Sequence, residues 1–222
     1  MAAVLADAAA LAAWQALDVG AINRAWTHHE TARYGALEAR DPVLLAHAMA
    51  QQAFVLIDIG EMLSAQELVA EAWREAGQQL PPRFKAWLHA AEAEIAAASG
   101  DRGHTARSFD RAATALSSSE EAVDPDMPFI VLNEAHLARW RGNALARLGV
   151  HGAVGELYKA LNDGGSASDR AAASLRCDLA QALSKQGDYA EARIHAVEAR
   201  RLARRSGSVR QRRRIDRLAF QT

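Results

Sequence analysis

One set of polar side chains has a spacing that would let its members act together. His136, Arg139 and Asn143 lie at i, i+3 and i+7, which places them on one face of a helix. The Arg139 guanidinium offers a forked pair of donors, and the Asn143 amide adds two more, a combination that suits a carboxylate or another anionic group. A solvated helix face with an ordinary ion pair explains the spacing equally well. The trio predicts one of these two arrangements.

The other chemically capable residues do not form a catalytic or metal-binding pattern. The His-His-Glu run at 28–30 is consecutive, so its side chains diverge around a helix. The chain has no His-Glu-x-x-His motif, no pair of cysteines and no phosphate-binding loop. Glu92, Glu94 and Glu134 would supply an acid and a base, but nothing locates a nucleophile. We therefore expect a protein that is not an enzyme and has no metal or cofactor.

The single cysteine, Cys177, excludes an intrachain disulfide and agrees with a reducing compartment. Its neighbour Asp178 does not favour a thiolate, so we interpret Cys177 as a small buried hydrophobic residue rather than a redox sensor. No uninterrupted apolar run approaches the roughly 20 residues that span a bilayer, and the N-terminus lacks the basic region of a signal peptide. These features predict a cytoplasmic protein without a membrane partner.

The charge of the chain is nearly balanced overall, at −1, but is uneven along its length. The last 32 residues hold ten Arg against three acidic residues, Glu191, Glu198 and Asp216. No aromatic residues are interleaved with these Arg side chains. A solvated cap that contacts acidic neighbours is therefore favoured over a nucleic-acid surface. The cluster consists of Arg200, Arg201, Arg204, Arg205, Arg210, Arg212, Arg213, Arg214 and Arg217.

The elements that must position these residues are punctuated by glycine. Gly20, Gly60, Gly100, Gly149 and Gly187 each end one Ala- and Leu-rich run and precede another, at spacings of about 40 residues. Such a period marks repeated helical hairpins, and one hairpin cannot bury its apolar face alone. The hairpins must therefore stack into a solenoid, which presents an extended binding surface.

The clearest repeat is KQGDYAEARIHAVEAR, from Lys185 to Arg200, and it resembles a tetratricopeptide repeat. We define the repeat numbering by counting each turn glycine as position 15. Positions 8, 20 and 27 then hold the small residues where paired helices touch. The first, second and fifth hairpins have Ala at all three. The third has Thr105 at its position 20, and the fourth has Gly142, Val154 and Leu161.

The resemblance implies an all-α fold, a right-handed superhelix of about five hairpins followed by a capping helix. We expect a single repeat domain, residues 1–222, with hairpins near 2–40, 41–79, 82–116, 128–162 and 168–205 and a capping helix at 208–220. Asp41, Ser168, Asp188 and Ser208 are predicted N-caps. The segment Ser117–Pro128 is predicted to be a mobile surface loop because it is rich in Ser and acidic residues.

In tetratricopeptide repeats, the first helix of each hairpin lines the concave groove at positions 2, 5, 9 and 12 or 13. This resemblance predicts a groove that is aromatic at its N-terminal end and polar near the fourth hairpin. The predicted ligand-binding residues are Trp14, His47, Phe54, Trp87, Glu94, His136, Arg139, Asn143 and Gln181.

The resemblance extends beyond the generic repeat. Segments such as LLAHAMAQQAFVLIDIG, LPPRFKAWLHAAEAE and SGSVRQRRRIDRL are similar to the C-terminal repeat domain of actinobacterial transcription regulators of the XRE family, which carry an N-terminal Cro-like helix-turn-helix domain. That DNA-binding domain would precede residue 1. The resemblance implies a sensing domain that binds a peptide, small molecule or protein, with DNA contacted only through the missing domain. A homodimer is compatible with this interpretation. The alternative is a free-standing protein–protein adaptor with no link to DNA.

Overall fold

The computed structural model describes residues 1–77, 79–118, 127, 129–130, 132–162 and 168–218. Over these residues the regular secondary structure is entirely helical, as predicted. The chain divides into two compact units. Unit 1 comprises Met1–Leu17 and Ala21–Glu134, and unit 2 comprises Asp18–Gly20 and Ala135–Thr222. We describe each unit by itself, and a single continuous repeat domain stays a prediction.

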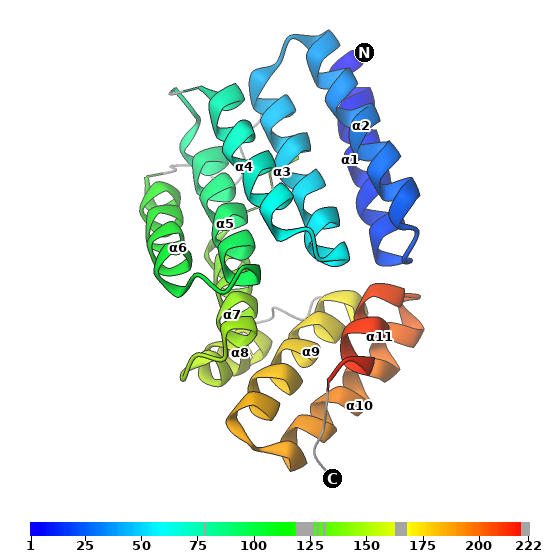
Figure 1. Ribbon diagram of the computed structural model, residues 1–222, viewed down its shortest axis with the longest axis vertical. Coiled ribbons are helices and arrows are strands. Elements are labelled where there is room, and N and C mark those ends of the chain that lie inside the picture. Colours follow the sequence, from blue (N-terminus) through cyan, green and yellow to red (C-terminus); the bar gives the residue numbers. More distant parts are fainter. Residues whose placement is uncertain (78, 119–126, 128, 131, 163–167, 219–222) are drawn as a thin grey trace. The chain divides into compact units, whose positions relative to one another are not determined.

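Unit 1 is built from the helices α1 to α6, drawn from blue to green in Figure 1. Helix α3 contacts α2, α4 and α5, and α5 also contacts α4 and α6, so helices that follow one another in the chain pack side by side. The bounds are α1 Ala2–Asp18, α2 Ile22–Ala39, α3 Pro42–Ile59, α4 Met62–Ala76, α5 Pro82–Ala98 and α6 Arg102–Ser117.

Unit 2 contains the helices α7 to α11. Helix α9 contacts α8, α10 and α11, and α10 contacts α11, so the last helix packs on the final hairpin. The bounds are α7 Glu134–Leu148, α8 Ala153–Asn162, α9 Asp169–Gln186, α10 Tyr189–Arg205 and α11 Val209–Asp216.

The five turn glycines determine where the hairpins reverse direction. Gly20, Gly60, Gly100, Gly149 and Gly187 all adopt left-handed backbone conformations, with φ between 66° and 91°. A side chain with a Cβ atom rarely adopts this region, whereas glycine enters it without steric cost. At Gly60 and Gly187 the amide of the glycine also bonds to the end of the preceding helix, which closes the helix C-terminus.

Each predicted N-cap forms the expected hydrogen bond. The Asp41 carboxylate accepts from the amide of Leu44 at 2.9 Å, and Pro42 opens α3 at the first helical position. Ser168, Asp188 and Ser208 cap α9, α10 and α11 in the same way. The local sequence therefore sets the starts of these four helices.

Small residues form the contacts between paired helices. Every Ala at positions 8, 20 and 27 is buried with 0% exposure, and Thr105 is 1% exposed. Val154 and Leu161, at the same positions of the fourth hairpin, are only partly buried. There, Gly142 makes the close approach instead. A Cβ added to it would lie 2.7 Å from the Leu157 side chain. In this hairpin, a leucine of the second helix therefore packs directly on the small residue at position 8.

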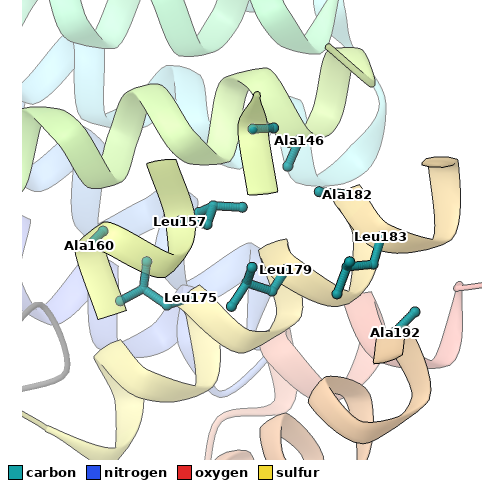
Figure 2. Packing of buried hydrophobic residues seen from close by; sticks show 9 residues of the cluster. Ala146, Leu157, Ala160, Leu175, Leu179, Ala182, Leu183 and Ala192 are labelled. Atoms are coloured by element: carbon teal, nitrogen blue, oxygen red, sulfur yellow. The ribbon is translucent and has the colours of Figure 1, made fainter. Parts of the chain in front are cut away.

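The hydrophobic core of unit 2 is built around Leu157. Leu157 of α8 packs with Leu175, Leu179 and Leu183 of α9, and Ala146 of α7 belongs to the same cluster. Figure 2 shows the leucines pointing into the space between these helices. Full burial of each leucine stabilises the unit by about 1.5–3 kcal/mol relative to exposure.

Helix α3 bears on the sequence-based expectation that no segment spans a membrane. Its 18 residues, Pro42–Ile59, are long and apolar enough to cross a bilayer by length and composition. Most of this helix is buried inside unit 1, because it packs against three other helices. Its apolarity therefore reflects its central place in the unit.

Most of the predicted mobile loop lies outside the described residues, namely 119–126 and 128 of Ser117–Pro128. Within the described part of the chain, Ser117 is the last residue of α6. Met127, near the end of this segment, is only 5% exposed, whereas a residue in a solvated loop would be largely exposed.

Candidate functional site

The predicted groove residues of unit 1 meet in pairs across successive first helices. Trp14 of α1 and Phe54 of α3, both at position 9, have ring centroids 5.4 Å apart. His47 of α3 and Trp87 of α5, both at position 2, lie 4.6 Å apart edge to face. Equivalent repeat positions thus form two aromatic contacts. Glu94, the position 9 residue of α5, is buried.

The His47–Trp87 pair belongs to a larger aromatic cluster, which consists of His47, Phe84, Trp87 and Phe129. Phe84 stacks on Trp87 at 6.2 Å and 9°, and its centroid is 6.4 Å from that of His47. Phe129 lies 4.9 Å from His47. His47 is only 3% exposed, and Trp87 and Phe84 are buried as well. The parts of α3 and α5 that carry His47 and Trp87 are therefore covered.

The residues that accompany Phe129 come from the stretch between α6 and α7. Met127, Ile130 and Leu132 are 5%, 0% and 2% exposed. The guanidinium of buried Arg83, at the start of α5, donates to the Leu132 carbonyl. Sequence reasoning missed this placement. The apolar pattern of Met127, Phe129, Ile130 and Leu132 was the available signal, but it resembles the start of a helix.

A second buried group in unit 1 is polar. The Gln51 amide lies 2.7 Å from Nε2 of His47, and Arg33 donates to Gln52 at 3.2 Å. Both ring nitrogens of His29 are buried without a hydrogen-bond partner. Burial, followed by the charge of His28, lowers the pKa of His29 to about 4. Burial, followed by the charge of His29, lowers the pKa of His47 to about 3. Both imidazoles are therefore neutral near pH 7.

In unit 2, the predicted polar trio divides into two parts. His136 and Arg139 are half-buried on α7. Burial and then the Arg139 charge lower the pKa of His136, and burial lowers the pKa of Arg139. Asn143 instead donates to the Asp178 carboxylate of α9 at 2.6 Å. Gln181, on the same helix as Asp178, is half-buried. Asn143 thus makes a contact within the unit, and His136 lies close enough to Arg139 for the guanidinium charge to lower the pKa of its imidazole.

Asp178 joins three helices of unit 2. It is 2% exposed and accepts from both Asn143 of α7 and Arg214 of α11, the latter at 2.5 Å. The adjacent Cys177 is buried with Ile215 of α11. Burial raises the pKa of the Cys177 thiol to about 11, which disfavours the reactive thiolate. The site therefore ties the last helix to the final hairpin.

Several members of the C-terminal arginine cluster face acidic partners rather than open solvent alone. Arg214 pairs with Asp178, Arg200 with Asp216 at 2.5 Å, and Arg205 with Asp169 at 3.0 Å. Arg201 pairs with Glu198 one turn away on α10. The exposed pairs contribute little stability each, about 0–1 kcal/mol. Their main effect is to neutralise much of the local positive charge.

One polar group that the sequence did not indicate surrounds Tyr158 in unit 2. Its hydroxyl donates to Glu191 and lies 2.8 Å from Nε2 of His195, while Arg176 is 3.4 Å from the other ring nitrogen. Burial and the bond to Glu191 raise the pKa of Tyr158 to about 12. Glu191 and His195 share a face of α10, but Tyr158 is 33 residues from Glu191, so no local pattern in the sequence indicates this group.

A second such group lies in unit 1, where Glu92 bridges His89 at 3.2 Å and His104 at 2.9 Å. Burial pushes the pKa of Glu92 upward, but the hydrogen bonds from the two histidines outweigh it and lower the pKa. Among the described residues, no group of His, Cys, Asp or Glu has the arrangement of a metal site. The bridge therefore joins α5 to α6.

An open cleft of about 710 Å³ lies in unit 1 along α5 and α6. Lys85 and Arg111 carry the positive charge of its lining, and Asp110 carries the negative charge. The predicted groove residues are not part of this lining. Leu80, Pro82, His89, Thr114, Ala115 and Ser118 complete it.

Comparison with known proteins supports the fold alone. No protein-family model and no curated protein matches the sequence. Among solved structures, the chain is similar to a candidate kinesin light chain of Podospora anserina with nearly identical TPR-like repeats. The TM-score is 0.51 at 13% sequence identity, over 90% of this chain and 95% of the other. The chain thus has a tetratricopeptide-like helical repeat fold.

Proposed function

We propose that this chain binds a peptide segment of a partner protein on the inner helices of its repeats and relays that binding to an attached DNA-binding domain. The observation that carries the proposal is the pairing of Trp14 with Phe54 at equivalent repeat positions. Trp14 is half-buried and Phe54 nearly fully so, which leaves part of the indole ring exposed to solvent. Aromatic side chains presented along a helical repeat are suited to an apolar anchor residue of a peptide.

The link to transcription rests on the resemblance to XRE-family regulators. In that arrangement, the bound peptide would favour one packing of the repeat over another, because a ligand shifts an equilibrium only by its different affinity for the two states. The half-buried pair His136 and Arg139 would contribute affinity for a carboxylate of the ligand. The chain itself carries no catalytic role in this proposal.

The peptide-binding part is tested by selection from a displayed library of random dodecapeptides against the immobilised chain. Selected peptides are then measured by fluorescence anisotropy against Trp14→Ala and, as a matched control, Trp26→Ala. Trp26 lies on α2, the second helix of the same hairpin. We expect Trp14→Ala to weaken binding about tenfold or more, and Trp26→Ala to change it little. Equal effects of the two variants would contradict a site on the inner helices.

The regulatory part is tested by the coding sequence upstream of residue 1. A reading frame that continues through a helix-turn-helix pattern supports the regulator. A natural start at Met1 would support the adaptor instead. Chromatin immunoprecipitation with the full-length protein then tests whether it occupies DNA.

A further inference from the structure

In unit 1, the surface around His47 is occupied by the chain segment that contains Phe129 and Leu132. Phe129 lies against His47 at 4.9 Å, and Arg83 donates to the carbonyl of Leu132. The side chains of Met127 and Ile130 are buried along with that of Leu132. His47 and Trp87, which the repeat numbering assigns to the ligand-binding surface, are thereby covered.

This stretch is held as a bound peptide would be held. The Arg83 guanidinium recognises a backbone carbonyl, a contact that does not depend on the side chain of the bound residue. The ring of Phe129 packs on His47, which itself contacts Phe84 and Trp87, as an anchor residue of a peptide packs on an aromatic surface. The surface is thus suited to a short apolar segment that contains an aromatic residue.

The local backbone also allows the stretch to leave. It lies between α6 and α7 and belongs to neither helix. Among its described residues, the backbone forms a turn in which the Ile130 amide donates to the Met127 carbonyl at 3.0 Å. The helical hydrogen bonds of α3 and α5 do not depend on it. Segments held mainly by side chains open at a lower free energy than packed helices.

We propose that Met127, Phe129, Ile130 and Leu132 form a built-in occupant of the surface around His47 in unit 1, and that an apolar, aromatic-containing peptide of the partner binds there by displacing them. This inference rests on the proposed function and adds its site and its regulation. The built-in occupant reduces the fraction of molecules that are competent to bind, so it weakens the apparent affinity for the partner. It also favours partners whose peptide has the same apolar pattern.

The test uses a fluorescein-labelled peptide with the sequence of residues 126–133, DMPFIVLN, added to the full chain. The released variant is Phe129→Ser with Ile130→Ser. The matched control is Ile194→Ser with Val197→Ser, which changes two exposed apolar residues of unit 2. We expect the released variant to bind the peptide at least about tenfold more tightly than the unmodified chain and the control. A peptide with Ser in place of Phe should lose this binding.

Equal peptide affinity of the released variant and the unmodified chain, with both folded by circular dichroism, would overturn the inference. Hydrogen exchange on the unmodified chain provides a second measurement, which does not depend on the stability of the variant. The amides of Phe129, Ile130 and Leu132 should exchange at least about tenfold faster than those of α5. Exchange as slow as that of α5 would identify the stretch as a fixed part of the core and would also overturn the inference.

The library experiment separates this inference from the proposed function. Selected peptides that require Trp14 but bind the unmodified chain and the released variant equally would overturn the built-in occupant alone. Selection without any peptide binder, together with no binding of the 126–133 peptide, would overturn both.

Discussion

The predicted binding positions of unit 1 and unit 2 have opposite chemistry. At position 2, unit 1 has His47 and Trp87, which pack against each other and are buried, whereas unit 2 has half-buried His136. At position 9, unit 1 pairs Trp14 with Phe54, while unit 2 ties Asn143 to an acidic residue of the next hairpin. The same repeat geometry thus produces an aromatic, covered surface in one unit and a polar surface in the other. Repeat position therefore determines where a residue lies, and residue type determines whether its side chain is buried against neighbours.

The largest expected difference between the units is at position 2. Trp87→Ala removes a buried ring that contacts His47 and Phe84, so we expect it to lower the free energy of unfolding by about 3–5 kcal/mol. His136→Ala, at the equivalent position of α7, should cost less than about 1 kcal/mol. Urea unfolding followed by circular dichroism measures both. Similar losses would mean that the two surfaces are equally embedded.

The pH dependence of stability should come largely from unit 1. The pKa values of His29 and His47 lie at about 4 and 3 in the folded chain, below the ordinary value of about 6.5. The unfolded chain therefore binds protons first, and stability is lost as the pH falls from 6.5 towards 4. Each histidine should account for about 2 kcal/mol between pH 7 and pH 5.

This pH prediction has a direct check by substitution. His29→Leu should reduce the loss between pH 7 and pH 5 by about 2 kcal/mol in urea unfolding experiments. His151→Leu, at an exposed histidine of unit 2, is the control and should leave the pH dependence unchanged. An unchanged slope in His29→Leu would show that His29 is not neutral in the folded chain.

A smaller effect is expected at Asn143. Asn143→Ala leaves the buried carboxylate of Asp178 with Arg214 but without its amide donor, so we expect a loss of about 1–2 kcal/mol. Arg214→Ala in the same background should then cost more than it does alone, because Asp178 would lose both donors. A double-mutant cycle measures this coupling, and additive losses would exclude it.

The smallest expected effect on stability is at Arg139. Its side chain is half-buried on α7, and Arg139→Ala should change the free energy of unfolding by no more than about 0.5 kcal/mol. If unit 2 binds an anionic group of the partner, the same variant should weaken partner binding. If Arg139→Ala unfolds the chain, Arg139 has a structural role. Unit 2 would then lack the polar binding position that distinguishes it from unit 1.

The sequence predicted most of the local features because they depend on neighbouring residues. The left-handed turns require glycine, and the helix starts require Asp or Ser at the N-cap, so both follow from short segments. The small positions also followed from spacing, including the irregular fourth hairpin. There, Gly142 is the small residue of the first helix, and Leu157 packs against it.

The candidate site was predicted less completely. The repeat numbering identified Trp14 with Phe54 and His47 with Trp87 as equivalent positions, and these pairs do touch. It did not indicate that Asn143 bonds to Asp178, 35 residues later. Such a contact depends on how α7 and α9 lie beside each other, which a single helix does not encode.

By itself, the amino-acid sequence determined the hairpins of this protein, their turns and the small residues that let paired helices approach. Each of these features is selected by backbone sterics within a few residues of the chain. Only the tertiary structure decided which of the inner positions are covered. Phe129 reaches His47 from 82 positions further along the chain, and Arg83 holds the carbonyl of Leu132. These contacts arise from packing between segments that are distant in sequence, and local propensity carries no information about such packing.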